Sequence, residues 1–297
     1  MKINFHSQYS GHSAAVYCLS HGQVPGEFYS SGGDGMIVRW QLGKEDGKAL
    51  ANIGEPVFSL LHTPNWVFAG TQGGRLYRID PKGQTAPRRM DFHRKSIHAL
   101  LWLEDALYTA SADGIIAQIA PEQFELIKAL KTSPEGIRSM ASCKARKSII
   151  LGCQQGQIFE INTRLEHLQR IAYCPESRTI FGLAIPDEGN EIFIGAMDAR
   201  LRTFSFHNMD IMGEAIPAHQ WTINDLIWID ELHILATASR DRSIRFWTRE
   251  SLSPITSITE FKYNGHHRSV NKLLWLKEKG VLLSGSDNQQ VKAWIIE

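Results

Sequence analysis

Short runs in which apolar and polar residues alternate fill most of the chain. The clearest example lies between Ala218 and Trp247, where the runs INDLIWI and HILATAS are followed by a polar turn at Arg240 and Asp241 and by the run SIRFW. Alternation with a period of two is typical of half-buried β-strands. Three strands joined by tight turns form a small antiparallel sheet with an apolar face that it cannot cover alone. Such units are therefore expected to stack on one another.

The same unit recurs along the whole chain. Each copy has a turn residue that is followed six positions later by an aromatic or aliphatic residue, and the turn residues are 39 to 47 residues apart. This spacing falls in or near the period of about 40 to 45 residues that is typical of propeller blades. It predicts an all-β fold, a seven-bladed β-propeller of four-stranded antiparallel blades, with residues 1–297 as a single domain. The seven pairs are Asp34 with Trp40, Gly73 with Ile79, Asp113 with Ile119, Gln155 with Ile161, Asp198 with Phe204, Asp241 with Trp247, and Asn288 with Trp294.

Two further signals point to a known family. Gly-His pairs occur at Gly11-His12 and Gly265-His266, with degenerate forms at Phe92-His93 and Ala218-His219, and three copies end in Trp. With these residues the chain resembles the WD-repeat (β-transducin-like) family over nearly its whole length. The resemblance implies a hydrogen-bonded network of His, Ser or Thr, Asp and Trp side chains in each complete repeat.

The network residues implied by the resemblance differ in completeness between copies. The second, fourth and fifth copies lack the His and the Trp and are assigned by spacing and alternation. The first copy has Gly32 where the hydroxyl is expected, and the third ends in Ile119 in place of Trp. The implied residues are His12, Asp34 and Trp40 in the first copy; His93, Ser111 and Asp113 in the third; His219, Ser239, Asp241 and Trp247 in the sixth; and His266, Ser286, Asn288 and Trp294 in the seventh.

The seventh copy ends at Glu297, directly after its third strand. We therefore infer that Ile3–His6 supplies the fourth strand of the last blade, as is common in the resembled family. This N-terminal strand would close the ring and remove open sheet edges, which otherwise promote aggregation. The polar stretch Gly43–Lys48 is expected to be a solvated loop.

Composition narrows the class of protein. There are 32 basic and 31 acidic residues, so the net charge of +1 does not favour general binding to nucleic acids or membrane surfaces. No signal-peptide-like start and no apolar run of about 18 residues are present. We expect a cytoplasmic protein that binds neither a cofactor nor a metal ion. Four cysteines without CxxC or zinc-ligand spacing are expected to be buried free thiols, which suits a reducing compartment: Cys18, Cys143, Cys153 and Cys174.

The residue types of His219, Ser239 and Asp241 are those of a hydrolase triad. However, similar spacings recur in other copies, whereas an active site needs one nucleophile, and no G-x-S-x-G motif is present. We therefore predict a structural network and a protein that is not an enzyme. A lactonase-like or hydrolase-like propeller enzyme is the alternative, and it would need polar ligands pointing into the channel from several blades. The expected inward positions form no such ligand set: Ser59, His98, Ser139, Gly182, Asp225 and Lys272.

The resemblance places the His-bearing loops and the Asp-bearing turns on one rim, called the top face. Top-face loops hold mostly basic residues, and the opposite loops mostly acidic ones. Arg and Trp are enriched at binding hot spots, and Arg binds carboxylates or phosphates at two points. We therefore predict a protein–protein interaction platform, a monomeric propeller within a complex, whose top face binds an acidic or phosphorylated segment of a partner. The predicted partner-binding residues are Arg94, Arg178, Trp221, Arg240, His267 and Arg268.

A nucleic-acid-associated scaffold is a third hypothesis, suggested by the basic top rim. Salt-dependent affinity for duplex or single strands would favour it, because binding to phosphates releases counterions.

Overall fold

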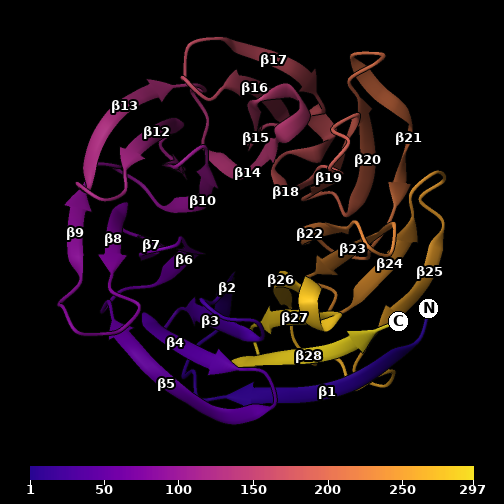
Figure 1. Cartoon of the computed structure of the whole chain (residues 1–297). Helices are drawn as coiled ribbons and strands as arrows, with labels where there is room; N and C mark the ends of the chain where they lie inside the picture. Colours follow the sequence, from indigo (N-terminus) through magenta and orange to yellow (C-terminus); the bar gives the residue numbers. More distant parts are fainter.

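The computed structural model describes residues 1–297 and consists almost entirely of β-strands. Seven four-stranded antiparallel sheets are arranged around a central channel, as Figure 1 shows. The predicted seven-bladed propeller is confirmed. Each sheet is one blade, and blades 1 to 7 follow the order of the seven sequence copies.

The strands of each blade run from the channel to the outer edge of the ring. Blades 1 to 3 contain β2 (Val16–His21), β3 (Glu27–Gly32), β4 (Met36–Gln41) and β5 (Lys44–Asn52); β6 (Val57–His62), β7 (Val67–Thr71), β8 (Arg75–Ile79) and β9 (Arg88–Asp91); and β10 (Ile97–Leu103), β11 (Ala106–Ser111), β12 (Ile115–Ala120) and β13 (Glu125–Lys131). Blades 4 and 5 contain β14 (Ile137–Cys143), β15 (Ser148–Cys153), β16 (Gln157–Asn162) and β17 (Leu168–Tyr173); and β18 (Ile180–Ala184), β19 (Glu191–Ala196), β20 (Arg200–Ser205) and β21 (Asp210–Pro217). Blades 6 and 7 contain β22 (Ile223–Ile229), β23 (Ile234–Ser239), β24 (Ile244–Thr248) and β25 (Pro254–Ile258); and β26 (Val270–Leu276), β27 (Val281–Ser286), β28 (Gln290–Ile296) and β1 (Ile3–Ser10).

Three single-turn 3₁₀ helices connect some of these strands: η1 (Lys144–Arg146), η2 (Pro175–Ser177) and η3 (Lys277–Lys279). None of the helices has the length and apolar character needed to cross a membrane.

Neighbouring blades pack closely because the second strand of most blades has a small residue where the next blade approaches. A Cβ atom added at Gly195 in β19 would lie 2.7 Å from Ile223 Cγ2 of blade 6. Gly70, Gly152 and Gly285 meet a β-branched residue of the next blade in the same way. The absence of a side chain thus lets β-branched residues fill the space between sheets. Stacking of this kind buries the apolar faces that a single blade would leave exposed.

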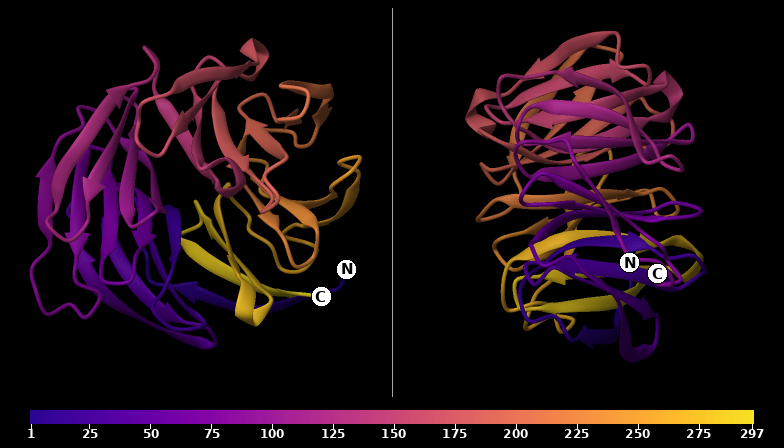
Figure 2. Two further views of the ribbon diagram at one scale, coloured as in Figure 1. Left: turned by 45° about the horizontal axis from the view of Figure 1, so that its top comes forward. Right: turned by 90° about the vertical axis from the view of Figure 1, so that its left-hand side faces the viewer.

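The N-terminal strand closes the ring, as predicted. β1 pairs antiparallel with β28, from Ile3 opposite Ile296 to Ser10 opposite Gln290, so the strand is longer than the expected Ile3–His6. Figure 2 shows the two ends of the chain side by side, where Lys2 and Glu297 exchange two backbone hydrogen bonds. Ile3 joins the core between blades 6 and 7. At the other end of β1, Tyr9 joins the core between blades 7 and 1.

The prediction of a solvated loop at Gly43–Lys48 is wrong. β5 begins at Lys44 and pairs with β4 along the outer edge of blade 1. Most of its side chains are exposed, so the strand lacks the one-sided apolar pattern by which half-buried strands are recognised.

Candidate functional site: the top face and the channel mouth

The top face of the structure consists of the loops that precede the first strand of each blade and the turns that join the second strand to the third. In four blades a hydrogen bond between a loop histidine and an Asp or Asn of the turn joins these two segments. In blade 1, His12 lies in the loop before β2 and Asp34 in the turn after β3, and His12 Nδ1 is 2.9 Å from Asp34 Oδ2. The bond fixes the top-face loop on its own blade.

The buried network is most complete in blade 6. His219 Nδ1 is 2.9 Å from Asp241 Oδ2, and His219 Nε2 is 2.7 Å from Thr237 Oγ1. Trp247 Nε1 donates to the same Thr237 hydroxyl over 2.9 Å. The hydroxyl that joins the imidazole to the indole therefore belongs to Thr237, and the prediction of Ser239 in this role is wrong. Ser239 Oγ instead donates to the Trp221 carbonyl and accepts from the Asp241 backbone N–H.

The same displacement by two residues holds in the other networks. In blade 1 the linking hydroxyl is Ser30, which accepts from Trp40 Nε1, so the expected gap at Gly32 does not exist. In blade 3 it is Thr109, and Ser111 bonds the Lys95 carbonyl. In blade 7 it is Ser284 instead of Ser286, and Trp294 Nε1 donates to the Tyr263 carbonyl.

Burial governs the charge state of these networks. Burial lowers the pKa of His219, and with the nearby Lys292 it lowers the pKa of His266 to about 3. Burial opposes ionisation of Asp241, yet the hydrogen bonds it accepts, the first from His219, hold the pKa of this carboxyl well below its usual range. His219 forms no hydrogen bond with the Ser239 hydroxyl, so His219, Ser239 and Asp241, which have the residue types of a triad, do not form a proton relay from a nucleophile. The geometry is that of a satisfied structural network.

The six predicted partner-binding residues are all exposed on the top face. Trp221 exposes 58% of its surface, and the Arg240 guanidinium lies 5.5 Å from the centre of its ring. His267 and Arg268 lie in the adjacent blade 7 loop. Arg94 belongs to blade 3, across the channel from blades 6 and 7 in Figure 1, so the six residues are spread around the rim.

The top-face cations differ in whether a carboxylate neutralises them. Arg75 forms an ion pair with the top-face carboxylate of Glu55 over 3.0 Å. Another top-face carboxylate, that of Asp287, accepts a hydrogen bond from the neutral amide of Asn271. By contrast, none of the four predicted arginines forms an ion pair: Arg94, Arg178, Arg240 and Arg268. Arg178 also lines a shallow cavity of about 440 Å³ between blades 4 and 5, beside the exposed ring of Tyr173. These arginines are free to bind an external anion.

A second feature of the top face was not predicted from the sequence. In all seven innermost strands the β-ladder is interrupted at the second residue of the strand. A β-bulge re-aims the side chain of the extra residue. These seven residues, here called the mouth ring, line the channel just below the top-face loops: Tyr17, Phe58, His98, Arg138, Phe181, Asn224 and Asn271.

Members of the mouth ring contact one another around the channel. Tyr17 packs edge-on against Phe58, and Phe58 stacks on His98 with ring centres 5.5 Å apart. Arg138 Nη1 lies against the His98 imidazole, 3.0 Å from Nδ1, and the Arg138 guanidinium lies 4.8 Å from the centre of the Phe181 ring. The channel cavity has a volume of about 570 Å³.

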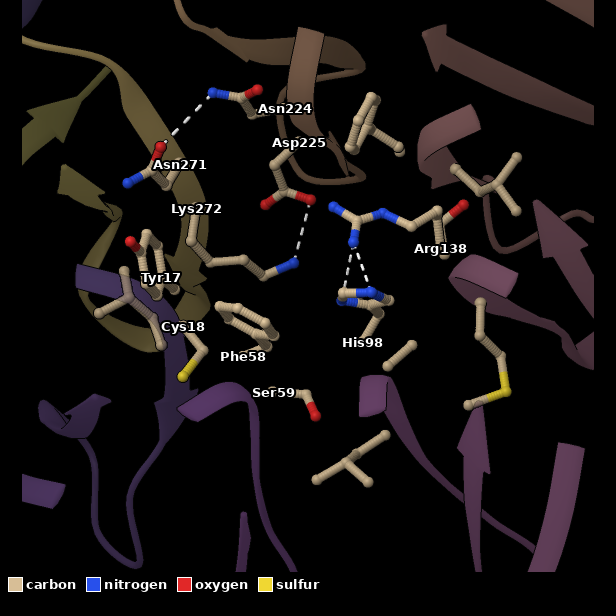
Figure 3. A pocket seen from close by; sticks show the side chains of 18 of the residues that line it. Tyr17, Cys18, Phe58, Ser59, His98, Arg138, Asn224, Asp225, Asn271 and Lys272 are labelled. Atoms are coloured by element: carbon tan, nitrogen blue, oxygen red, sulfur yellow. Dashed lines mark hydrogen bonds and ion pairs between the residues drawn. The ribbon is translucent and has the colours of Figure 1, made fainter. Parts of the chain in front are cut away.

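One layer deeper, Lys272 Nζ donates to Asp225 Oδ1 over 3.0 Å. Figure 3 shows Lys272, Asp225, Arg138 and His98 pointing into the same space. All six expected inward positions line this cavity: Ser59, His98, Ser139, Gly182, Asp225 and Lys272. The Ser59 and Ser139 hydroxyls donate to backbone carbonyls of neighbouring blades and are thereby occupied.

Comparisons with known proteins agree with this geometry. The profile of the WD40 family, described as WD domain, G-beta repeat, matches residues 4–41, 213–248 and 256–294. These segments hold the inner three strands of blades 1, 6 and 7, which are the blades that carry Trp40, Trp247 and Trp294. Three of the seven blades are thus similar to WD40 repeats.

Similar proteins extend the comparison beyond these three segments. A 66 kDa stress protein of Physarum polycephalum is 22% identical over 291 residues, which cover 80% of this chain and 47% of that protein. The chain thus spans about half the length of this curated relative. The crystal structure of the WD40 beta propeller domain of Doa1 has a TM-score of 0.87, with 13% sequence identity, and covers 100% of this chain and 97% of that chain. At this identity the likeness to Doa1 shows the fold.

Proposed function

We propose that this WD40 propeller is a non-catalytic platform whose top face binds an acidic or phosphorylated segment of a partner protein. WD40 propellers are generally protein-interaction scaffolds. The observation that supports the proposal most directly is the pair of Trp221 and Arg240, an exposed indole beside a guanidinium that no carboxylate neutralises. Arg268 in the adjacent loop adds a second free cation.

The chemistry of these side chains suits a protein partner. Trp221 exposes 58% of its surface, so a partner that covers it removes about 90 to 150 Å² from water, worth roughly 2 to 4 kcal/mol at about 25 cal/mol per Å² before the costs of association. Arg binds a carboxylate or phosphate through two parallel hydrogen bonds, which adds orientation to affinity. A segment with a negative charge close to an apolar residue would therefore satisfy Trp221 and Arg240 together.

The cellular setting of the proposal follows from the thiols. All four cysteines are buried and free, and burial raises the pKa of Cys153 to about 12, so this thiol is protonated and unreactive. Free thiols persist in a reducing compartment, which supports a cytoplasmic location. We place the chain there as a monomeric propeller within a larger complex.

The test is capture of partners from the cell of origin with the tagged wild-type chain and with the double variant Arg240→Glu, Arg268→Glu. The proposal predicts that proteins retained by the wild type are lost with this variant. Lys147→Glu with Lys279→Glu is the matched control, since both lysines are exposed on the opposite face and the charge change is the same. Equal capture by the top-face variant and the wild type would refute the proposed surface.

A further inference from the structure

Arg138 is the one mouth-ring cation, and it has no counter-ion. It takes part in no ion pair, and its Nε is buried without a hydrogen-bond partner. A guanidinium has five N–H donors, and the protein contacts of Arg138 are the His98 imidazole and the face of Phe181. Burying a cation without an anion is costly, so a fold does not gain stability from this arrangement.

The charges around Arg138 leave one positive charge uncompensated. Lys272 is neutralised by Asp225, whose second oxygen accepts the Leu273 backbone N–H over 2.9 Å. Burial and the adjacent Arg138 lower the pKa of His98 to about 3, so the imidazole is neutral at physiological pH. The group of Arg138, Lys272, Asp225 and His98 therefore carries a formal charge of one, located on Arg138.

The walls of the channel mouth specify the rest of the ligand. Tyr17, Phe58 and Phe181 present aromatic rings to the cavity and suit an apolar stem next to the charged group. Asn224 and Asn271 have their amide groups bound to each other and to backbone carbonyls. Among the mouth-ring side chains, Arg138 is thus the charged group without a counter-ion, and Figure 3 shows it pointing into the channel.

We propose that the mouth ring binds one carboxylate, carried by an Asp or Glu side chain of the partner segment that lies on the top face. A carboxylate neutralises the single free charge of Arg138, whereas a phosphate dianion would bring a surplus negative charge close to Asp225. The mouth ring begins one residue below the top-face loops, so a segment bound there reaches the cavity with a single side chain. This inference rests on the proposed function and specifies its central contact.

The test uses sodium benzoate as the probe, because it joins a carboxylate to an aromatic body. Binding is followed by NMR through the backbone amides of residues 137–139 in the wild-type chain. Benzamide has the same shape without the charge and provides a control that needs no variant. Since a hydrogen bond to a charged group contributes about 1.5 to 3 kcal/mol, benzoate is expected to bind at least about tenfold more tightly than benzamide.

Two variants locate the site. Arg138→Met keeps the length of the stem and removes the charge, and it is expected to weaken benzoate binding at least about tenfold. Arg164→Met, at an exposed arginine in the turn between β16 and β17 on the opposite face, is expected to bind benzoate as the wild type does. Equal binding of benzoate and benzamide, equal binding by Arg138→Met and wild type, or tighter binding of inorganic phosphate than of benzoate would each overturn the proposal.

The source of the carboxylate is tested separately by partner capture. Arg138→Met is expected to lose the captured partner, while the matched Arg164→Met control retains it. If benzoate binds the wild type but Arg138→Met captures the partner undiminished, the carboxylate belongs to a free small molecule and the assignment to a partner side chain is overturned. Because the benzoate titration needs no partner, its failure removes the channel contact and leaves the capture result for Arg240 and Arg268 standing.

Discussion

Replacing Thr237 by Val tests the buried network of blade 6 with a nearly isosteric change. The substitution removes one hydroxyl, which bonds His219 Nε2 over 2.7 Å and accepts from Trp247 Nε1 over 2.9 Å. Thr237 is fully buried, and Trp247 exposes 2% of its surface, so water cannot replace the lost partner. An unsatisfied buried polar group costs about 1 to 3 kcal/mol, and the two groups together cost roughly 2 to 6 kcal/mol.

Urea denaturation measures this effect as a change in the free energy of unfolding. A loss of native-state stability lowers the midpoint and leaves the slope with urea unchanged. Ser239→Ala is the matched control, because Ser239 bonds only the Trp221 carbonyl and the Asp241 backbone N–H, and it is expected to cost about 1 kcal/mol or less. Thr109→Val in blade 3 is expected to cost about half as much as Thr237→Val, since Ile119 replaces the Trp there and one polar group is orphaned. A larger cost for Ser239→Ala than for Thr237→Val would refute the assignment of the linking hydroxyl.

Four further predictions concern ring closure, pH, packing and the channel. Deleting residues 1–9 removes nearly all of β1, including the buried Tyr9. Loss of the Tyr9 side chain alone lowers the free energy of unfolding by about 3 to 5 kcal/mol, so the melting temperature should fall by roughly 6 to 12 °C or more. An unchanged melting temperature would refute closure by this strand. Lowering the pH from 6.5 to 5 should destabilise the chain by up to about 2 kcal/mol through His266. The pKa of His266 is about 3 in the folded chain and 6.5 in the unfolded chain, so unfolding takes up a proton in this pH range. A urea midpoint that does not change with pH would contradict this. Gly195→Val should lower the free energy of unfolding by about 1 to 3 kcal/mol or more, because the added side chain forces blade 5 away from Ile223. Urea denaturation measures the change, and no change would show that the blades can separate without cost. Arg138→Met should leave the melting temperature unchanged or raise it, since the partly buried guanidinium lacks a counter-ion; a marked drop would assign Arg138 a structural role.

The inner three strands of each blade could be predicted from the sequence because they are half-buried. In blade 6, β22 and β23 read as apolar and polar alternation, and the turn at Asp241 marks the crossing to β24. The outer strands are exposed, and β5 carries polar side chains along most of its length. No one-sided pattern distinguishes such a strand from a loop, which is why Gly43–Lys48 was assigned wrongly.

The details of the site depend on contacts that sequence spacing does not resolve. Thr237 and Ser239 are two residues apart in one strand and therefore point to the same face, so both satisfy the pattern of a hydroxyl near the turn. Only their distances to His219 distinguish them. The mouth ring was missed because a β-bulge breaks the period of two at Arg138 and its counterparts. The recurrence of aromatic, Arg, His or Asn residues at the second position of each inner strand was the signal that could have located it.

Hydrogen–deuterium exchange of the chain with and without a captured partner tests the central claim most directly. The claim is the proposal that the protein acts through the top face of a closed seven-bladed ring. It predicts new protection from exchange in the top-face segments 218–222, 239–243 and 266–269. Protection confined to the opposite loops, around residues 144–147, 230–233 and 277–280, would contradict the claim.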